Sequence, residues 1–498
     1  MSLTTCYILP ATCSMKDLSA RILNMAQMRG ATYCDVRVVN RTLQMLGVKD
    51  GRVQEMMQQE SQGFGVRVIA DGAWGFAACS RDDYADVDAT VNRALQNARA
   101  SALTKTREVR LGQPEANKGV FRSTFKLDPF MVSMSDKINL LLKADSEMRR
   151  AKPKNVHLVT TSELVFVREE KTFASSEGAL IHQEIVESGC EIQALATNEA
   201  GEVQTRTWPW GRHQQTRGFE FVLEQQLVEN APRLTQEAVE LLRADACPAF
   251  DATTVILSGN QVALQVHESC GHPIELDRVL KQEASFAGTS FLTPEKLYHL
   301  QYGSEIVNLT ADATTPGGLG TFGYDDEGVP AQRIEVVKDG RFVGYMTNRE
   351  LATEMNLGRS NGTMRAESWN HLPLIRMTNI NLLPGAWKLD DLIADTDDGI
   401  YFDTNRSWSI DDKRLNFQFG CELAWEIKGG KKTRLLKNPI YTGVTPIFWR
   451  GCDAICDQAE WVVWGTPRCG KGQPAQTIRT GHGASPARFR NVKVFSKS

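Results

Sequence analysis

The chain has 498 residues, which is enough for two or three domains that each have a core. Its 57 basic and 60 acidic residues give a net charge of -3, so no strong field favours nucleic acid or an anionic membrane as its partner. No run of 18 apolar residues is present, and no positive charge precedes the short apolar run near the N-terminus. The sequence therefore predicts neither a membrane span nor a secretory signal, and it favours a cytoplasmic location.

Two further features of the composition bear on the class of protein. Eleven cysteines, an odd number, are scattered over the whole chain, which fits reduced thiols or metal ligands better than a disulfide framework. The last twenty residues lean basic, and we expect a solvated tail there, with Arg479, Arg488, Arg490 and Lys493.

The first 150 residues alternate between helices and strands. Helical spacing of apolar residues predicts helices over 14–28, 82–100 and 135–150, the last capped by Ser135. Between the first two helices, short runs rich in Val, Leu, Ile and aromatic residues predict a meander of five strands over 34–39, 42–48, 52–57, 65–70 and 74–79. Asp50-Gly51 and Asp71-Gly72 supply the residues that tight hairpin turns favour.

The remainder of the chain is mostly strands. Four strands are expected between 154 and 207, a long helical stretch over 220–244, and a boundary at "DACPAF", 245–250. Beyond it, a strand and a short helix lead into a glycine-rich loop and then hairpins centred on Asp339-Gly340 and Gly429-Gly430. We predict an α+β protein. Its N-terminal α/β region, residues 1–245, contains strand meanders and helices and is expected to be the scaffold for substrate binding and dimer formation. Its C-terminal domain, residues 246–498, is expected to be rich in β-strands.

The segment "HESCGHPIELD" concentrates metal-binding residue types in a chain that has only eight histidines. In an HExxH zinc motif, two histidines four residues apart share a helix face, and the glutamate activates the bound water. Here His267 and His272 are five apart, roughly 140° around a regular helix, so the helix must deform to aim both imidazoles at one ion. Gly271 tolerates non-helical torsions and Pro273 disfavours helical ones at His272, so we expect a π-type turn with an unwound end.

Spacing alone leaves three interpretations of this segment open. His267, Glu268 and His272 form a metal site with its own general base, or the histidines are satisfied polar groups at a fading helix end. In a third interpretation, Cys270 is a nucleophile with a neighbouring histidine as its base, although residues this close on a helix end point apart.

The motif and its surroundings resemble the TldD/PmbA family of zinc metallopeptidases. "HESCGHPIELD", "YDDEGVPAQRIEVVKDGRFVGYMTNRELA", "RMTNINLLPG" and "RCGKGQP" occur in the family's order, and residues 31–80 are similar to its opening domain. The resemblance covers most of the chain. It implies that His267, His272 and Cys469 hold a zinc ion and that Glu268 is the general base, as in the TldD-like catalytic branch. Two imidazoles and one thiolate leave a position for water, which a catalytic zinc requires.

The surroundings of these residues support further expectations. Arg468 and Lys471 flank Cys469 and would favour its thiolate, while Glu275 and Asp277 either hold a ligating histidine or serve as caps and surface residues. The pair Cys452 and Cys456 has a spacing unusual for a zinc knuckle, and we expect buried free thiols.

The segment 402–431 departs from the glycine-rich pattern usual in catalytic members. "NRSWS" and "IDDKRLNFQFG" replace much of it. The departure bears on substrate preference and on the partner, and it leaves the proposed ligands untouched.

The sequence therefore predicts a zinc-dependent peptidase that hydrolyses unfolded or small peptides. The resemblance implies a homodimer, or a heterodimer with a PmbA/TldE-like paralogue; we expect no nucleic acid or membrane partner. The alternative is a non-catalytic, zinc-containing subunit that binds peptides or modulates a partner protein.

Overall fold

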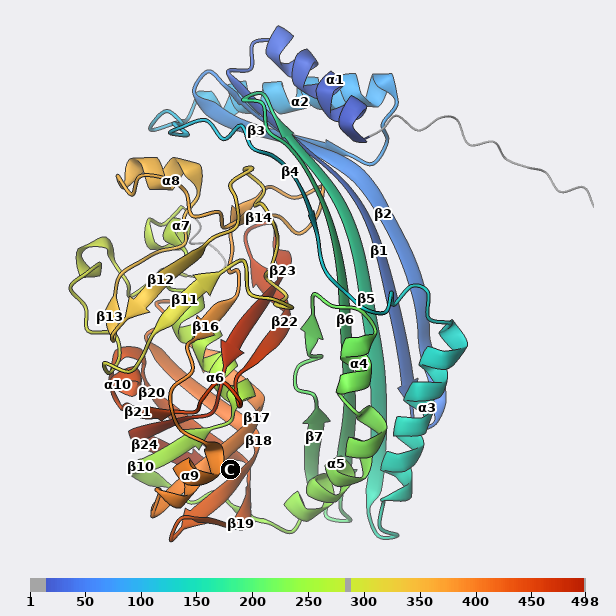
Figure 1. The fold of residues 1–498 in the computed structure, drawn as a ribbon, viewed down its shortest axis with the longest axis vertical. Helices are drawn as coiled ribbons and strands as arrows, with labels where there is room; N and C mark the ends of the chain where they lie inside the picture. The colour runs from blue at the N-terminus through green and yellow to red at the C-terminus, as the bar shows by residue number, and fades with distance from the viewer. Residues whose placement is uncertain (1–14, 283–287, 497–498) are drawn as a thin grey trace, which may run out of the picture.

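Two large sheet assemblies dominate the computed structural model, which describes residues 15–282 and 288–496 (Figure 1). The first is an eight-stranded sheet with the order β3-β2-β1-β5-β6-β4, in which β6 also pairs with β7 and β8. Its strands are β1 Tyr33–Lys49, β2 Arg52–Ala70, β3 Ala73–Cys79, β4 Lys118–Arg122, β5 His157–Ser175, β6 Leu180–Thr197, β7 Val203–Trp208 and β8 Gln214–Gln215.

The central strands of this sheet are much longer than the sequence predicts. The two strands expected over 34–39 and 42–48 are one strand, β1, and those over 52–57 and 65–70 are one strand, β2. Neither Asn40 nor Arg41 interrupts the ladder, because both pair with β2 and β5. The turn at Asp50-Gly51 has the expected positive φ values of 48° and 76°.

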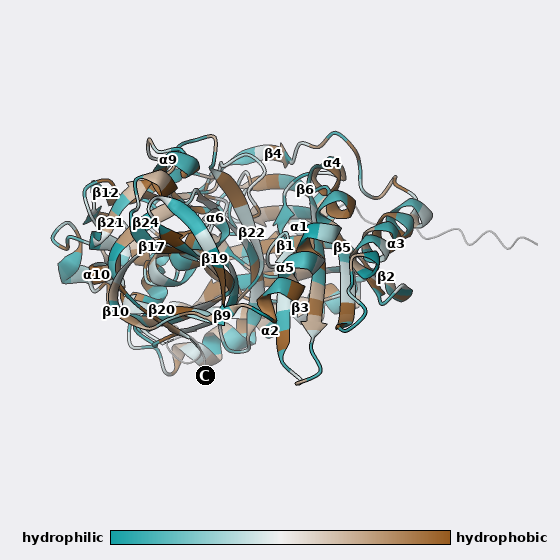
Figure 2. Ribbon diagram, turned by 90° about the horizontal axis from the view of Figure 1, so that it is seen from below, coloured by the Kyte–Doolittle hydropathy of each residue, from teal (hydrophilic) through white to brown (hydrophobic). Residues whose placement is uncertain are grey.

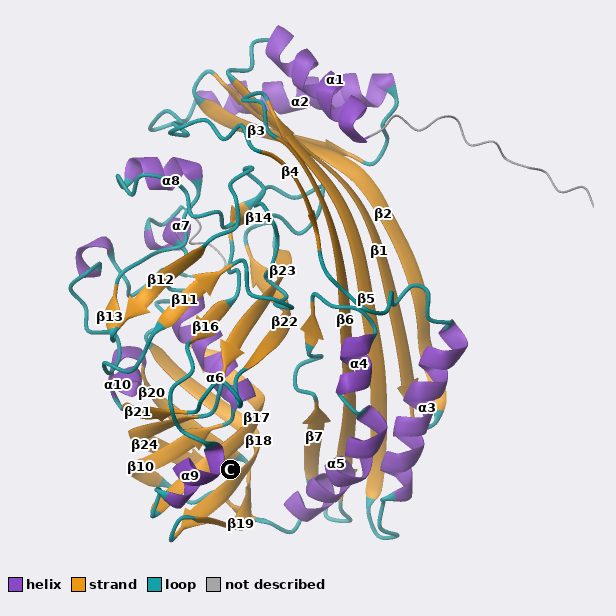
Figure 3. Ribbon diagram, in the orientation of Figure 1, coloured by secondary structure: helices purple, strands orange, loops and turns teal. Residues whose placement is uncertain are grey.

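Helices cover the two ends of the first sheet (Figure 3). Helices α1 Met15–Met28 and α2 Tyr84–Ala102 share one apolar core with β1 and β2. Helices α3 Met134–Arg150, α4 Glu220–Glu224 and α5 Leu227–Leu241 share another with β5 and β6.

Three details of these helices differ from the expectation. The helix-capping residue of α3 is Ser133, whose Oγ accepts from the backbone N–H of Asp136, and not Ser135. The helical stretch over 220–244 is broken between α4 and α5, where Gln226 takes a left-handed φ of 49°. Ser14, where we expect the first helix to start, lies outside the described residues.

The second assembly contains a closed ring of strands, seen end-on in Figure 2. The ring runs β17-β10-β24-β20-β18 and closes because β18 also pairs with β17. Strands β19 and β9 extend it from β18, and β21 pairs with β24. The bounds are β9 Asp245–Ala246, β10 Phe250–Leu257, β17 Asp398–Ile410, β18 Asn416–Lys428, β19 Lys431–Lys437, β20 Pro439–Val444, β21 Cys452–Ile455 and β24 Ala487–Ser496.

Smaller elements surround this ring. A four-stranded sheet has the order β13-β12-β11-β16, and β14 pairs with β15 and β22 with β23. These strands are β11 Leu309–Asp312, β12 Arg333–Lys338, β13 Arg341–Phe342, β14 Met364–Arg365, β15 Leu374–Ile375, β16 Ile380–Leu382, β22 Val462–Lys471 and β23 Gln476–Ala484. The helices are α6 Gly259–Val266, a π turn His267–Gly271, α7 Leu276–Val279, a 3-10 turn Pro294–Lys296, α8 Arg349–Glu354, α9 Leu389–Ala394 and α10 Thr445–Arg450.

The chain is therefore an α+β protein with helices and long strands in its first half and a β-rich second half. A domain boundary between residues 245 and 246 remains a proposal. The short strand β9 spans this point and pairs with β19 of the second assembly. Within residues 15–282 and 288–496, no helix has both the length and the apolar character needed to cross a membrane.

Buried ionic contacts join the two assemblies. Arg206 on β7 binds Glu237 on α5, Asp403 on β17 and Glu422 on β18, with N···O distances of 2.8, 3.2 and 2.9 Å.

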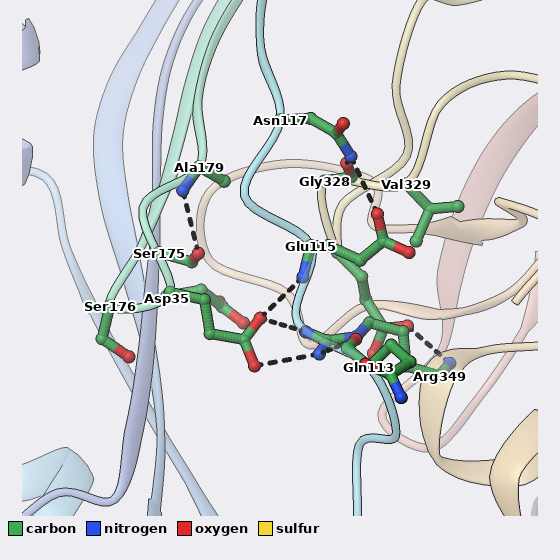
Figure 4. Close-up of polar contacts among 12 residues, drawn as sticks. Asp35, Gln113, Glu115, Asn117, Ser175, Ser176, Ala179, Gly328, Val329 and Arg349 are labelled. Carbon is green, nitrogen blue, oxygen red and sulfur yellow. Dashed lines mark hydrogen bonds and ion pairs between the residues drawn. The ribbon is translucent and has the colours of Figure 1, made fainter. Parts of the chain in front are cut away.

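A second set of contacts lies near the other end of the first sheet (Figure 4). Asn117 Nδ2 donates to Glu115 and to the carbonyl of Gly328, and Arg349 Nη2 donates to the carbonyl of Gln113. The segment between α2 and β4 is thereby attached to the second assembly.

The basic C-terminal residues are not a solvated tail, contrary to our expectation. Arg479 on β23 binds Glu187 and Glu169 of the first sheet at 2.8 and 3.2 Å. Arg488 on β24 binds Asp395 and Asp453, both at 2.8 Å. Only Lys493 is largely exposed, because the strand places these side chains on different faces.

Candidate metal centre

Helix α6 carries the HExxxH segment into the interior of the second assembly. All eight of its residues are buried, and the amides of Gln261 and Gln265 are both hydrogen-bonded to the Tyr441 hydroxyl. At His267 the helix widens, and the N–H of His272 donates to the carbonyl of His267 at 3.2 Å, five residues back. This is the π turn that the five-residue spacing predicts, and it brings the two imidazole centroids to 4.9 Å.

Gly271 and Pro273 act differently from our expectation. His272 keeps helical torsions, with φ −66° and ψ −42°, so Pro273 does not unwind this position. Gly271 is required by packing, because a Cβ at this position would collide with Sδ of the buried Met377. The missing side chain lets the wide turn lie directly against Met377.

Cys469 on β22 reaches this turn from almost 200 residues along the chain. One nitrogen of His267, one of His272 and the Sγ of Cys469 lie within 4.8 Å of one another. The distance from His272 Nε2 to Cys469 Sγ is 3.7 Å, close to the roughly 3.5 Å that separates nitrogen and sulfur ligands of tetrahedral zinc. The donor set and its spacing therefore fit a zinc ion.

A hydrogen-bond chain fixes which nitrogen of His267 is available. His482 on β23 accepts from or donates to His267, with 2.8 Å between His267 Nδ1 and His482 Nε2. The other nitrogen of His482, Nδ1, lies 3.2 Å from the carbonyl oxygen of Ile380, which can only accept. We therefore assign the protons to both Nδ1 atoms, which leaves Nε2 of His267 with a free lone pair. Burial and the neighbouring His267 hold the pKa of His482 well below its ordinary value, so its imidazole is neutral.

Glu275 orients His272 in the same way. His272 Nδ1 lies 3.1 Å from Glu275 Oε2, so its proton is on Nδ1 and its Nε2 faces Cys469. Burial alone would raise the pKa of Glu275, but the charge of Lys471 and the hydrogen bond from His272 hold it well below the usual range. Asp277 does not contact a histidine; its carboxylate accepts from Lys471 Nζ at 2.7 and 2.9 Å.

The Cys469 thiol has surroundings that favour its thiolate. Burial raises its pKa, but His272 and then Arg376 lower it below the ordinary value. Arg376 also donates to the backbone carbonyl of Cys469. From the sequence we expect Arg468 and Lys471 to favour the thiolate of Cys469, and the structure differs. Arg468 is exposed, and Lys471 is bound by Asp277.

Glu268, the candidate general base, is buried beside the ligands and held by an arginine. Arg414 Nη1 donates to Glu268 Oε2 at 2.6 Å. Arg414 lies in the turn between β17 and β18, within the segment that departs from the family pattern. In the sequence, this segment stands out only because it departs from the pattern usual in catalytic members of the family. No periodicity or spacing connects Arg414 to Glu268.

The competing cysteine interpretations find little support in the geometry. Cys270 is fully buried in the apolar core, and burial raises the pKa of its thiol well above the ordinary value. Cys452 and Cys456 lie in different apolar clusters. Among the described residues, His267, His272 and Cys469 form a group spaced to hold a metal ion, and nine cysteines are free thiols.

Comparison with known proteins identifies the family of this chain. The family model of the PmbA/TldA metallopeptidase C-terminal domain matches residues 251–496, and those of domain 1 and the central domain match 34–98 and 127–245. The chain belongs to the TldD/PmbA metallopeptidase family. The TldD/PmbA resemblance that the sequence shows is thus confirmed.

Relatives across the TldD/PmbA family match nearly the whole chain. A metalloprotease of Methanocaldococcus jannaschii is 28% identical over 92% of this chain and 95% of its own. A TldD homolog metalloprotease of Haemophilus influenzae is 27% identical over 97% of both chains. A zinc metalloprotease TldD homolog of Saccharolobus solfataricus is 22% identical over 95% of this chain and 99% of its own.

Solved structures share the TldD/PmbA fold at low identity. TldE from Thermococcus kodakarensis has a TM-score of 0.73 and 17% identity, covering 96% of this chain and all of that one. A Thermotoga maritima protein, proposed to be a modulator of a DNA gyrase, has a TM-score of 0.77 and 15% identity, covering 96% of this chain and 99% of that one.

Proposed function

We propose that this chain is a zinc-dependent peptidase that hydrolyses peptide bonds in unfolded or small peptides. One observation carries the proposal: two imidazole nitrogens and one sulfur lie within 4.8 Å of one another, next to a buried carboxylate. Zinc held by His267, His272 and Cys469 would supply Lewis-acid chemistry and lower the pKa of a water molecule toward roughly 7. The relatives named metalloproteases support the same activity.

The protein's own residues then divide the remaining work. Arg414 holds Oε2 of Glu268, which leaves Oε1 to take a proton from the attacking water and to return it to the leaving amine. His482 and Glu275 hold the two imidazoles with their Nε2 atoms available, so neither ring needs to reorient when zinc binds.

Membership of the TldD/PmbA family supports a proposal for the assembly in which this chain works. We propose that the chain works as a homodimer or with a PmbA/TldE-like paralogue, and that an extended peptide pairs with a strand edge. The second candidate function is a non-catalytic, zinc-containing subunit that binds peptides or modulates a partner. The low exposure of the ligands in the single chain, 2–4%, favours it, because substrate access would need movement or a partner.

Zinc content and cleavage test the proposal together. The wild type and Glu268→Gln should each hold about one zinc ion per chain, and Cys469→Ala should hold much less because it loses a ligand. Cleavage of denatured casein should be abolished by 1,10-phenanthroline and restored by zinc. Glu268→Gln should lower the rate by roughly 10²–10⁴-fold, since it removes the proton acceptor.

A matched control is Cys452→Ala, which removes a buried thiol outside the site and should keep its zinc. Wild-type zinc content in Cys469→Ala, or undiminished cleavage by Glu268→Gln, would contradict the mechanism. One zinc per chain without chelator-sensitive cleavage, alone or with the paralogue, would favour the non-catalytic subunit.

A further inference from the structure

Arg414 is the cation nearest the candidate general base, and the proposed mechanism leaves most of its hydrogen-bonding capacity unused. We propose that Arg414 anchors a carboxylate of the substrate, so that the enzyme prefers peptides carrying a carboxylate next to the bond that is cleaved. This inference rests on the proposed peptidase function and adds the substrate class to it.

The turn that carries Arg414 is firmly fixed. Asp411 accepts from the backbone N–H groups of Leu415 and Asn416 at 2.7 and 3.1 Å. The carbonyl of Arg414 accepts from the Thr445 hydroxyl at 2.9 Å, and Arg414 has a left-handed φ of 62°. Contacts other than the ion pair therefore fix the backbone from which the Arg414 side chain extends to Glu268.

The hydrogen bonds of Arg414 leave donors without a partner. Of its guanidinium nitrogens, Nη1 donates to Glu268, while the buried Nε has no partner among the described residues. Arg206 shows the contrasting case, because Nε, Nη1 and Nη2 bind three different carboxylates. An arginine presents five N–H donors in a fork that matches a carboxylate, so Arg414 has room for a second one.

The charges around the site also favour an anionic ligand. Four cations contact three carboxylates in or next to the site: Arg278, Arg376, Arg414 and Lys471 against Glu268, Glu275 and Asp277. The cations therefore outnumber the carboxylates by one before any metal ion is counted. A divalent ion would add further positive charge to the site, and a substrate carboxylate would offset part of it.

The position of Arg414 determines which bond would be cleaved. Because its guanidinium touches Glu268, a carboxylate bound to another of its nitrogens lies up to about 7–8 Å from the base, which is roughly two residues of chain at 3.8 Å each. Either the C-terminal carboxylate or an Asp or Glu side chain beside the scissile bond meets this condition. Both sources present a carboxylate to Arg414, so the experiment tests each source with its own pair of peptides.

The test compares matched peptides on the zinc-loaded, full-length protein. One pair is acetyl-Ala-Ala-Phe-Ala as the free acid and as the C-terminal amide. The other is acetyl-Ala-Ala-Phe-Glu amide and acetyl-Ala-Ala-Phe-Gln amide. In at least one pair, kcat/KM should be about tenfold or more higher for the member with the carboxylate, as a charge-assisted hydrogen bond allows.

Two variants separate an anchor from a residue that only positions Glu268. Arg414→Gln should lower kcat/KM for both members of a pair, because it releases Glu268, but it should lower it further for the carboxylate peptide and so remove the preference; Arg414→Lys should restore part of that preference. Arg406→Gln, on the same hairpin but bound to Gln204 and Asn438, should keep the wild-type preference. An equal loss for both members of a pair in Arg414→Gln would overturn the proposal, and so would cleavage without any preference.

A binding measurement keeps this inference distinct from the peptidase proposal. Zinc-loaded Glu268→Gln, titrated calorimetrically with the same peptides, should bind the carboxylate member about tenfold tighter, and the double variant with Arg414→Gln should not. If that preference is found but the wild type cleaves no peptide, the anchor stands and the peptidase proposal fails. If neither assay shows a preference, the anchor is wrong.

Discussion

His213 illustrates how burial controls a single titratable residue outside the candidate site. Its ring packs against Phe221 and Trp464, with centroids 5.1 and 5.0 Å away, and its Nδ1 accepts from the N–H of Gly465 at 3.0 Å. Burial lowers the pKa of His213 to about 3. The folded protein therefore holds this histidine neutral at neutral pH.

This histidine predicts a measurable acid sensitivity. The unfolded chain takes up the proton near pH 6.5 and the folded chain only near pH 3, so stability falls as the pH drops below 6.5. At pH 5 the loss from this group is about 2 kcal/mol relative to pH 7. His213→Asn keeps an acceptor for Gly465, and its unfolding midpoint in urea should fall less than that of the wild type between pH 7 and pH 5.

Replacing the exposed His157 by Asn serves as the control and should leave the wild-type pH dependence unchanged. If His213→Asn loses stability between pH 7 and pH 5 as steeply as the wild type, titratable groups other than His213 cause the acid sensitivity.

At the same scale, the sequence identifies residues near one another in the chain much better than their partners from distant segments. His267, Glu268 and His272 stand out because they share one short segment, and Cys469 enters only through the family resemblance. His482 and Arg414 act through contacts across 215 and 146 residues. No local pattern encodes such contacts, although a histidine between Gly481 and Gly483 in a strand is unusual enough to notice.

Among the elements, the π turn is the one whose geometry the sequence predicts most directly. Five-residue spacing of two histidines requires one extra residue in the turn, and the structure has it. The reason for Gly271 could not be predicted, because Met377 lies more than 100 residues away and its contact with the turn exists only in the folded chain.

Gly271→Ala tests how tightly this turn must pack. The added methyl group would displace Met377 or the turn, and we expect a loss of about 1–3 kcal/mol in stability, which is typical of overpacking. Zinc affinity should fall with it, since His272 follows directly. Thermal unfolding and zinc titration measure the two effects.

Met377→Ala provides the matching partner variant. The double variant with Gly271→Ala should be less destabilised than the sum of the two single variants, because the new methyl group occupies the space that Met377 vacates. Strict additivity would show that the contact does not limit the turn.

The strands were predicted in place better than in number and length. Each of β1 and β2 was expected as two short strands because polar residues interrupt the apolar runs, for example Gln58 to Gln62. Those residues are largely exposed in β2, where the ladder continues through them because its hydrogen bonds come from the backbone. The periodicity of apolar residues reports which residues are buried, so it underestimates the length of a strand whose middle faces solvent.

For the whole molecule, Arg206 is the contact whose removal should be felt most widely. It joins the first sheet to the ring of strands through three carboxylates, two of them on the ring. Burial raises the pKa of Glu422 and Arg206 lowers it, with a resulting value of about 7. The carboxylate therefore depends on Arg206 for its charged form.

Arg206→Met should destabilise the protein by about 3–5 kcal/mol, because it leaves the buried carboxylate of Glu422 without a cation. Without the arginine, the pKa of Glu422 should rise further above its unfolded value, so the loss should be larger at pH 8 than at pH 6. Limited proteolysis should detect the weakened junction as faster cleavage near residues 242–250.

Adding Glu422→Met to Arg206→Met should recover part of the stability, since a buried ion pair can often be replaced by apolar side chains. Equal proteolysis of the wild type and Arg206→Met would show that other contacts suffice to hold the two assemblies together.

The separation of 197 residues between His272 and Cys469 has a consequence for biosynthesis. At 5–20 residues per second, a ribosome needs roughly 10 to 40 s to add the sulfur donor after the second imidazole has been made. Throughout that interval the nascent chain carries only two of the three donors. A newly made molecule can therefore complete this donor set only after Cys469 has been added, and under the proposed peptidase function it could not attack a neighbouring nascent chain before that point.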